Sequence, residues 1–307
     1  MGKYIVRRLL QMIPVILGTT FLIYTMVFAI PGNPVEGRCG ERPCPPNYIA
    51  AFNAEYHLDK PLLVQYALYL GKLLQGDLGT NFYGNSVAHE LAIRWPTTIK
   101  LAVMAIIIEI IIGISAGVLA GIRRGKFSDT LVTVSTLVLI SIPVFVIGNL
   151  AQLIFGVRLG WFPVTATHGT FYELIMPAFV LASLSVAYVA RLMRANLVEN
   201  LRADYVRTAR AKGLSNARTV GVHTLRNSLI PVITYIGIDL GALMGGAIVT
   251  ERIFNINGVG NFLYRSINQK DGVAVVGTIT MLVLVFLLAN LVVDILYGVL
   301  DPRISND

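Results

Sequence analysis

Long apolar runs with few or no charges recur along the chain. The hydrocarbon core of a bilayer, about 30 Å thick, needs roughly 20 apolar residues in helix at about 1.5 Å of rise each. Six runs have about this length, and they cover residues 9–30, 101–122, 131–157, 174–190, 228–250 and 273–293, the last continuing as an apolar pattern to Leu300. The pattern therefore predicts an all-α, polytopic membrane protein with six transmembrane helices.

A segment of different character, residues 31–100, separates the first two runs and is too long for a simple connection. Its start is rich in proline and glycine and cannot continue a helix. Helical periodicity follows, with one apolar face made of Leu62, Tyr66, Tyr69 and Leu73. Residues 85–100 fit an interfacial helix with Trp95 at headgroup depth. We expect a small helical cap, not an independent catalytic domain.

The distribution of basic residues predicts the orientation in the membrane. Fifteen of the 25 Lys and Arg residues lie at the two ends of the chain, in loop 123–129 and in residues 191–227. Short cytoplasmic loops are enriched in these residues, so both termini are expected in the cytoplasm. The formal net charge of +8 and the mean hydropathy of +0.69 then reflect topology. A nucleic-acid partner would need a soluble domain, and the sequence shows none.

These patterns divide the chain into four parts. The cytoplasmic N-terminus with the first span covers 1–30, and the external helical segment covers 31–100. The transmembrane core with five spans covers 101–300 and includes a cytoplasmic loop at 198–227, and a cytoplasmic tail covers 301–307. Such a chain is expected to be a multi-pass protein of the cytoplasmic (inner) membrane of a bacterium, surrounded by lipid.

The cysteines and histidines give little evidence of a metal site. Cys39 and Cys44, both on the expected outer side, are spaced so that a small-loop disulfide is sterically possible but not required. A bridge and two separate thiols both remain open. The four histidines are scattered along the chain, so no metal site is predicted.

Two sets of glycines recur at every fourth residue inside the apolar runs. They are Gly113, Gly117 and Gly121 in the second run, and Gly237, Gly241 and Gly245 in the fifth. On a helix each set forms a smooth stripe that another backbone can approach closely, which predicts tight helix–helix contacts there. The stretch "GISAG" also fits the G-x-S-x-G pattern of serine hydrolases, but that pattern requires a strand and a sharp turn rather than an apolar helix.

Polar or helix-breaking residues within the runs are candidates for a transport pathway. Glu109 and Asp239 are mid-helix acids, which are costly in a membrane and usually face protein or water. For Asp239 a pathway or interface role and a structural hydrogen bond both stay open, whereas the structural role is favoured for Glu109. Pro143, followed by Asn149, interrupts the third run, and such breaks often line a cavity.

The loop at 198–227 is basic and contains a strong helix former, "ADYVRTARAKG", that ends at the natural C-cap Gly213. Tyr205, Thr208, Ala209 and Lys212 are predicted to share one face of this helix. A short helix held at both ends by membrane spans would form a rigid knob that a partner could grip. The alternative is a solvated loop that only sets topology, and composition leaves both open.

The same segment resembles the cytoplasmic coupling loop of binding-protein-dependent ABC importer permeases. The general form of that loop is Glu-Ala-Ala, three residues, Gly, nine residues, and Ile-x-Leu-Pro. With Gly213 aligned, the Glu-Ala-Ala positions hold Arg207, Thr208 and Ala209. The Ile, Leu and Pro positions hold His223, Leu225 and Arg226. The chain departs from the general form there, but "DYVRTARAKG" followed by "HTLRNSLIPV" is similar to the version in dipeptide and oligopeptide permeases.

Other stretches carry the same resemblance over nearly the whole chain. They are "YIVRRLL", "PGNPV", "HLDKPLLVQY", "GDLGTNF", "GGAIVTERIFNINGVG" and "LDPR". The resemblance implies a second homologous permease, usually a different one, two ATP-binding subunits and an extracytoplasmic substrate-binding protein. It also implies that residues 204–222 dock in a groove of an ATPase, with coupling residues Asp204, Tyr205, Arg207, Thr208, Ala209, Arg210, Ala211, Lys212 and Gly213.

The chain itself is not expected to be an enzyme or to hold a cofactor. Each of its three Gly-Lys pairs is followed by Tyr, Leu or Phe instead of the Ser or Thr of a phosphate-binding loop, so ATP and Mg²⁺ would be bound by the partner ATPases. The resemblance implies peptides as substrate, although relatives carry nickel complexes, haem or glutathione. The alternative function is a stand-alone secondary transporter or channel driven by an ion gradient, which the mid-membrane acids favour.

Overall fold

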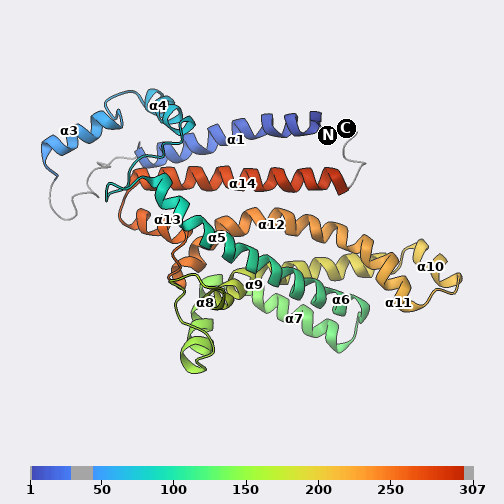
Figure 1. The fold of residues 1–307 in the computed structure, drawn as a ribbon. Coiled ribbons are helices and arrows are strands. Elements are labelled where there is room, and N and C mark those ends of the chain that lie inside the picture. The colour runs from blue at the N-terminus through green and yellow to red at the C-terminus, as the bar shows by residue number, and fades with distance from the viewer. Residues whose placement is uncertain (1, 29–43, 301–307) are drawn as a thin grey trace. The chain divides into compact units, whose positions relative to one another are not determined.

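The computed structural model describes residues 2–28 and 44–300, and there the chain is helical apart from short connections (Figure 1). It divides into two compact units. The first comprises residues 1–98 and 257–307, and the second comprises residues 99–256. One boundary falls within helix α5 (Val87–Ile108). The predicted all-α class is confirmed.

Four helices in the described residues are long and apolar enough to cross a membrane. They are Val6–Phe28, Val87–Ile122, Phe171–Asn200 and Gly272–Val293. Two pairs of helices that meet at a bend add one span each if the pair crosses the membrane as one unit. The first pair is Phe127–Ser141 and Val144–Arg158, and the second is Asn216–Leu243 and Ala247–Ile253. The structure therefore supports four to six spans, and the predicted six requires both bent pairs.

The second span differs from the prediction in where it begins. An interfacial helix at 85–100 and a span starting at residue 101 were expected, whereas α5, the π-helical turn η1 (Glu109–Ile114) and α6 (Ser115–Ile122) form one continuous helix from Val87. Trp95 packs against the buried cluster that contains Leu78, Val87 and Leu91, so tertiary packing fixes this part of the helix.

In the first unit, α1 (Gly2–Phe28) and α14 (Gly272–Leu300) lie side by side as long apolar helices (Figure 1). The short helix α13 (Val259–Asn268) leads into α14, and Asp271 caps the start of α14 by accepting a 3.2 Å hydrogen bond from the Ala274 backbone. The second carboxylate oxygen of Asp271 accepts the Phe82 backbone N–H at 2.7 Å. This carboxylate thereby ties a distant loop to the helix start.

The predicted helical cap is present as α3 (Pro46–Glu55) and α4 (Leu62–Leu74), each beginning just after a proline. The predicted apolar face of α4 is confirmed, because its four residues are buried or half-buried while Leu63 and Leu74 are 70% and 89% exposed. The Tyr66 hydroxyl lies 2.7 Å from the Thr20 hydroxyl of α1, and the Tyr69 hydroxyl lies 2.8 Å from that of Thr280 of α14. The cap is thus fastened to both long helices.

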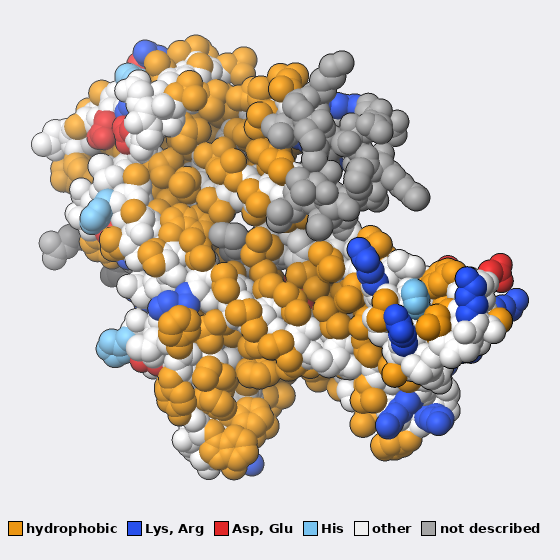
Figure 2. Space-filling model, turned by 45° about the vertical axis from the view of Figure 1, so that its right-hand side comes forward, with side chains coloured by type: hydrophobic (Ala, Val, Ile, Leu, Met, Phe, Trp, Pro, Cys, Tyr) orange, Lys and Arg blue, Asp and Glu red, His pale blue; other side chains and the backbone are white. Residues whose placement is uncertain are grey.

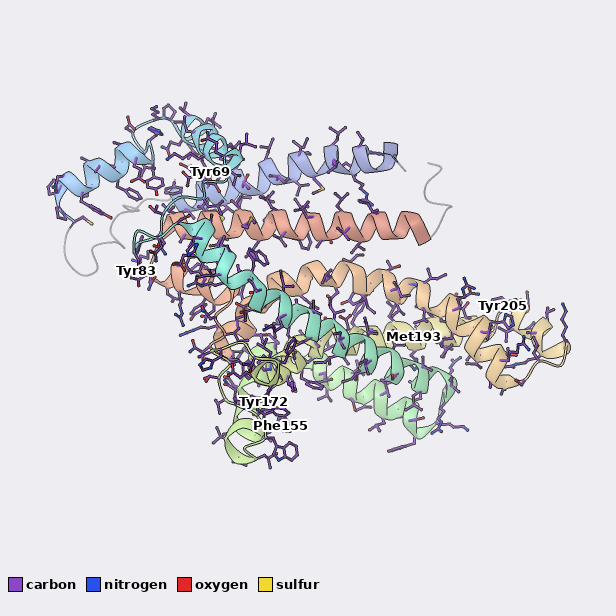
Figure 3. The ribbon with its side chains drawn as sticks, in the orientation of Figure 1. Tyr69, Tyr83, Phe155, Tyr172, Met193 and Tyr205 are labelled. Carbon is purple, nitrogen blue, oxygen red and sulfur yellow. The ribbon has the colours of Figure 1, made fainter. Side chains whose placement is uncertain are left out.

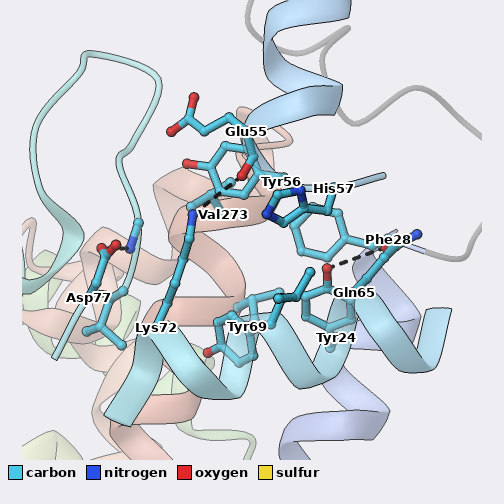
Figure 4. A pocket seen from close by; sticks show the side chains of 14 residues that line it. Tyr24, Phe28, Glu55, Tyr56, His57, Gln65, Tyr69, Lys72, Asp77 and Val273 are labelled. Carbon is cyan, nitrogen blue, oxygen red and sulfur yellow. Dashed lines mark hydrogen bonds between the residues drawn. The ribbon is translucent and has the colours of Figure 1, made fainter. Parts of the chain in front are cut away.

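A small cavity of about 40 Å³ lies beneath the cap among aromatic side chains (Figure 4). The Lys72 ammonium lies 5.4 Å from the ring centre of Tyr56 and so already occupies the cation–π position there. Burial raises the pKa of Tyr69, which also lines the cavity, to about 12, so its hydroxyl stays protonated at physiological pH. The remaining space holds about one water molecule, which is too little for a peptide.

In the second unit, α9 (Phe171–Asn200) is the central helix. It packs against α6, η1, α7 (Phe127–Ser141), α8 (Val144–Ala151) and α12 (Leu225–Ile253). Its apolar window is 67% buried within the chain, compared with 11% for Val6–Phe28. Thr170 caps its start by accepting the Glu173 N–H. This helix is therefore the core on which the other spans of the unit pack.

The first glycine ladder packs directly against α9. A Cβ added at Gly113 would lie 2.7 Å from Val189, one at Gly117 would lie 2.6 Å from the Ala190 carbonyl oxygen, and one at Gly121 would lie 2.9 Å from Leu197. The predicted close helix contact is confirmed for this ladder, with α9 as the partner helix. Asp129 of α7 adds a polar link, because its Oδ2 accepts a 2.8 Å hydrogen bond from Nη2 of Arg194 of α9.

The third run is broken far more sharply than a kinked span. Ile142 is extended and Pro143 begins α8, so α7 and the helix Val144–Arg158, which ends in the π-helical turn η2 (Gln152–Arg158), meet at 102°. Proline removes a backbone donor and drives the preceding residue out of helical geometry. The run predicted as one span over 131–157 is thus made of two half-helices, which form either a broken span, as the prediction requires, or a re-entrant loop.

Candidate functional site

The basic segment after α9 forms a short helix, α10 (Asp204–Ala211), as the sequence predicted. It is followed by a single turn, α11 (Asn216–Arg218), and the π-helical turn η3 (Thr219–Thr224), which leads into α12. Lys and Arg side chains gather at this end of the second unit (Figure 2). Figure 3 shows Tyr205 of α10 beyond the end of α9, on the far side of Met193 from Tyr172.

One face of α10 is packed against the chain and the rest is open. Val206 and Ala209 are 1% and 6% exposed, and α10 contacts η3. The exposed residues of the segment are Asp204, Tyr205, Arg207, Thr208, Arg210, Ala211, Lys212 and Gly213. Ala209 therefore lies on the inner face of α10, while Tyr205, Thr208 and Lys212, with which it was grouped, are open to a partner.

The end of α10 is fixed by the glycine that the sequence singled out. Gly213 has φ +80°, its N–H donates to the Arg210 carbonyl at 2.9 Å, and the Leu214 N–H donates to the Ala209 carbonyl at 3.2 Å. These two bonds form a Schellman motif, which requires a left-handed residue at this position. The predicted C-cap role of Gly213 is confirmed.

A chain of side-chain hydrogen bonds joins α10 to both neighbouring spans. The Tyr205 hydroxyl donates to Oδ1 of Asn200 at 2.8 Å, and Nδ2 of Asn200 donates to the Ser228 hydroxyl at 3.1 Å. Asn200 ends α9, and Ser228 lies near the start of α12, where it is fully buried. This amide therefore connects α10 to the end of α9 and the start of α12.

A separate feature of the second unit is a hollow of about 450 Å³ in its membrane-spanning part. It is lined from α7, α8, α9 and α12 by Ile140, Val144, Leu181, Leu184, Ser185, Tyr188, Arg191, Tyr235, Asp239, Ala242 and Leu243. Most of the lining is apolar, and among these residues Asp239 is the one acid and Arg191 the one base. The rings of Tyr188 and Tyr235 stack with their centres 4.3 Å apart.

The two mid-span acids, treated separately in the sequence, meet in this unit. Glu109 is fully buried and Asp239 is 9% exposed, and their carboxyl groups interact electrostatically. Ser185 and Tyr235 are further polar neighbours of Asp239. Both carboxylate oxygens of Glu109 and Oδ2 of Asp239 lack a hydrogen-bond partner among the described residues. Asp239 therefore brings a carboxyl group to the wall of the hollow, with the fully buried Glu109 beside it.

The other predicted pathway residues are less directly placed. Pro143 stands at the break before Val144, which does line the hollow, while Asn149 is exposed on α8 and is not part of the lining. Gly237 is half-buried, Gly241 is buried, and Gly245 lies further along α12. Neither Gly237 nor Gly241 belongs to the lining of the hollow.

The possible bridge between the two cysteines stays one of two open alternatives. Cys39 lies outside the described residues, and Cys44 packs with Phe52 and Val273 beside the cap. No cluster of three or more His, Cys, Asp or Glu side chains that could hold a metal occurs in residues 2–28 and 44–300.

Comparison with known families decides the class of the protein. The model of the binding-protein-dependent transport system inner membrane component matches residues 109–306, and the model of the N-terminal part of the same kind of membrane component matches residues 1–102. The chain belongs to this family. It is therefore a multi-pass inner-membrane permease, not an enzyme.

Curated relatives of this permease match it from end to end. It is 39% identical to the di/tripeptide transport system permease protein DppB of Pseudomonas aeruginosa, covering 100% of this chain and 99% of the relative. It is 36% identical to the dipeptide transport system permease protein DppB of Alkalihalophilus pseudofirmus (99% and 100% covered). It is also 36% identical to the glutathione transport system permease protein GsiC of Salmonella paratyphi A, with 99% of each chain covered.

Several residues of the permease were missed by sequence reasoning. Arg191 was counted only as a topology-setting charge at the end of an apolar run, and Tyr188 and Tyr235 carried no signal among the other aromatic residues. Asn200 and Ser228 looked like ordinary loop-flanking polar residues. All five residues were missed because their contacts depend on which helices pack together. The residue spacing along a single helix does not show this.

Proposed function

We propose that this chain is the permease subunit of an ATP-driven importer of short peptides. Two ATPase subunits supply the energy, a second homologous permease completes the pathway, and an extracytoplasmic binding protein delivers the substrate. The observation that carries the proposal is α10, a short basic helix held between two spans and open on the face of Tyr205, Thr208 and Lys212. Family membership and the names of the peptide-transporting relatives support it.

In the proposed topology both termini and the loop 198–227 are cytoplasmic, and the cap at 31–100 is external. Residues 204–222 dock in a groove of an ATPase, with the exposed residues of α10 making the contact. ATP-driven closure of the ATPases moves α10, and Asn200 and Ser228 pass the motion to α9 and α12. The hollow beside Asp239 forms part of the pathway, because α9 and α12 line most of it.

The docking of α10 can be tested by site-specific cross-linking. In a background with Cys39 and Cys44 changed to Ser, Thr208→Cys carrying a photoreactive maleimide should cross-link to an ATPase subunit in the purified complex. Leu63→Cys, on the 70%-exposed face of the cap, is the matched control and should give no such product. Cross-linking from the cap but not from α10 would contradict the proposed orientation.

The alternative, a stand-alone transporter driven by an ion gradient, is favoured by one observation. The buried pair of Glu109 and Asp239 resembles the carboxyl groups that bind coupling ions in such transporters. A stand-alone transporter would give α10 no role, and for this reason we favour the ATP-driven importer.

A further inference from the structure

An acidic and a basic side chain line the hollow of the second unit, and each has a buried polar atom without a hydrogen-bond partner among the described residues. Asp239 is 9% exposed, and its Oδ2 has no hydrogen-bond partner in the part of the chain that the structure describes. Nε of Arg191 is also buried without a partner there. Buried polar atoms without a partner are costly, so they are expected where a ligand of complementary chemistry binds. The hollow thus offers one site for a cation and one for an anion.

The separation of these charges follows from their positions on the helices. Asp239 is a neighbour of Ser185 on α9, and Arg191 lies six residues further along the same helix. At about 1.5 Å of rise per residue, the two sites are roughly 9 Å apart along the axis of α9. An extended chain spans at most about 3.3–3.6 Å per residue, so two residues reach about 7 Å and three reach about 10 Å. The spacing fits the two ends of a di- or tripeptide.

The wall between the charges is suited to variable side chains. The stacked rings of Tyr188 and Tyr235 lie along it, because residue 188 falls between 185 and 191 on α9 and residue 235 is one turn from Asp239 on α12. The rest of the lining is mostly aliphatic. Such a surface contacts side chains of many kinds without selecting one by hydrogen bonding.

We propose that this hollow binds zwitterionic di- and tripeptides by their ends. The Asp239 carboxylate receives the α-ammonium, with Glu109 as the acid beside it, and the Arg191 guanidinium receives the α-carboxylate. Recognition is then independent of the side chains of the substrate. The inference rests on the proposed function, because it gives a peptide importer its end-group specificity within the permease.

The test measures binding to the assembled transporter in nanodiscs without the binding protein, so that delivery does not affect the result. Tritiated dialanine is used in equilibrium dialysis, with unlabelled dialanine, N-acetyl-dialanine, dialanine amide and sodium chloride as competitors. For the unmodified protein we expect each blocked peptide to compete at least tenfold more weakly than dialanine, and sodium chloride at equal concentration not to compete.

Two charge-neutral variants then assign each end. Asp239→Asn should weaken dialanine binding about tenfold and should bind N-acetyl-dialanine and dialanine equally. Arg191→Gln should also weaken dialanine binding about tenfold and should bind dialanine amide and dialanine equally. Arg202→Gln removes an exposed positive charge just beyond the end of α9 and should change nothing. Asp239→Glu and Arg191→Lys keep the charges and should keep most of the binding.

Several results would overturn the inference. They are equal competition by blocked and free peptides, displacement by sodium chloride alone, and no dialanine binding at millimolar concentration. The competition by blocked peptides needs no variant, so it decides the matter even if Asp239→Asn does not assemble. Absence of ATP-driven uptake by the unmodified complex would instead refute the proposed function. End-specific binding can be measured independently of that uptake.

Discussion

The hydroxyl of Tyr205 donates a 2.8 Å hydrogen bond to Oδ1 of Asn200, and this joins the helix α10 to the end of α9. Nδ2 of the same amide donates a 3.1 Å hydrogen bond to the hydroxyl of Ser228 on α12. The inner face of α10 adds a second route, since Val206 and Ala209 are buried and the helix packs against η3. The helix α10 is therefore connected to both long helices of the unit.

Asn200→Leu should uncouple ATP hydrolysis from transport. The change keeps the γ-branched shape but removes the hydrogen bonds to Tyr205 and Ser228, and also the one to the Asn196 carbonyl, each of which contributes about 1 kcal/mol net. We expect uptake per ATP hydrolysed to fall roughly tenfold, while Tyr205→Phe, which removes one donor, causes a smaller decrease. Asn227→Leu removes an exposed amide at the start of α12 and serves as control. An unchanged ratio of uptake to hydrolysis in Asn200→Leu would show that the amide transmits nothing.

Gly213 should tolerate asparagine but not valine. Its φ of +80° is costly for a residue with a Cβ, by about 1–2 kcal/mol, and more for a β-branched one. No atom of the permease lies within 4 Å of the position a Cβ would take, so within this chain backbone strain is the whole effect. We expect Gly213→Val to lose most ATP-dependent uptake with normal membrane insertion, and Gly213→Asn to retain it. Equal activity of the two variants would exclude the Schellman cap as the reason.

Two alanines of α10 distinguish packing from docking. Ala209 is buried and Ala211 is exposed. An aspartate at Ala209 would place an unpaired charge in the packed face, which is strongly unfavourable. Ala209→Asp should therefore displace α10 and abolish uptake, as measured in proteoliposomes. If α10 docks as proposed, Ala211→Asp should instead lower co-purification of the ATPases. Binding of the ATPases that is unaffected by both changes would contradict docking through this helix.

Gly117→Ala should destabilise the permease because its Cβ would meet backbone. The Cβ would lie 2.6 Å from the Ala190 carbonyl oxygen of α9, which cannot move without shifting the helix. Overpacking of this kind typically costs 1–3 kcal/mol. Gly18→Ala, with no atom within 4 Å, is the matched control. Thermal unfolding in detergent should show a lower Tm for Gly117→Ala only, and equal Tm values would mean that the two helices separate easily.

The sequence predicted those features that a single helix determines. Apolar length gave the spans, the four-residue period of Gly113, Gly117 and Gly121 gave a close contact, and Gly213 marked the end of α10. Each depends on propensity, capping or periodicity within a few turns of one helix. Such properties can be seen in local sequence.

The features that depend on which helices meet were not predictable. Glu109 and Asp239 are 130 positions apart, and their meeting requires both η1 and α12 to pack on α9. The sequence indicated a loop charge at Arg191, whereas in the structure Arg191 lines a hollow together with residues of α7, α8 and α12. The proline at 143 predicted a break but not its angle of 102°, because packing on α9 sets the direction of α8.

The central claim is that this permease is moved by ATP hydrolysed on partner subunits. The most direct measurement is uptake of tritiated dialanine into proteoliposomes that contain the permease with its second permease, its ATPases and its binding protein. We predict uptake that requires ATP, is abolished when the ATPases are omitted, and does not respond to a proton or sodium gradient. Gradient-driven uptake by the permease alone, without ATP, would contradict the account.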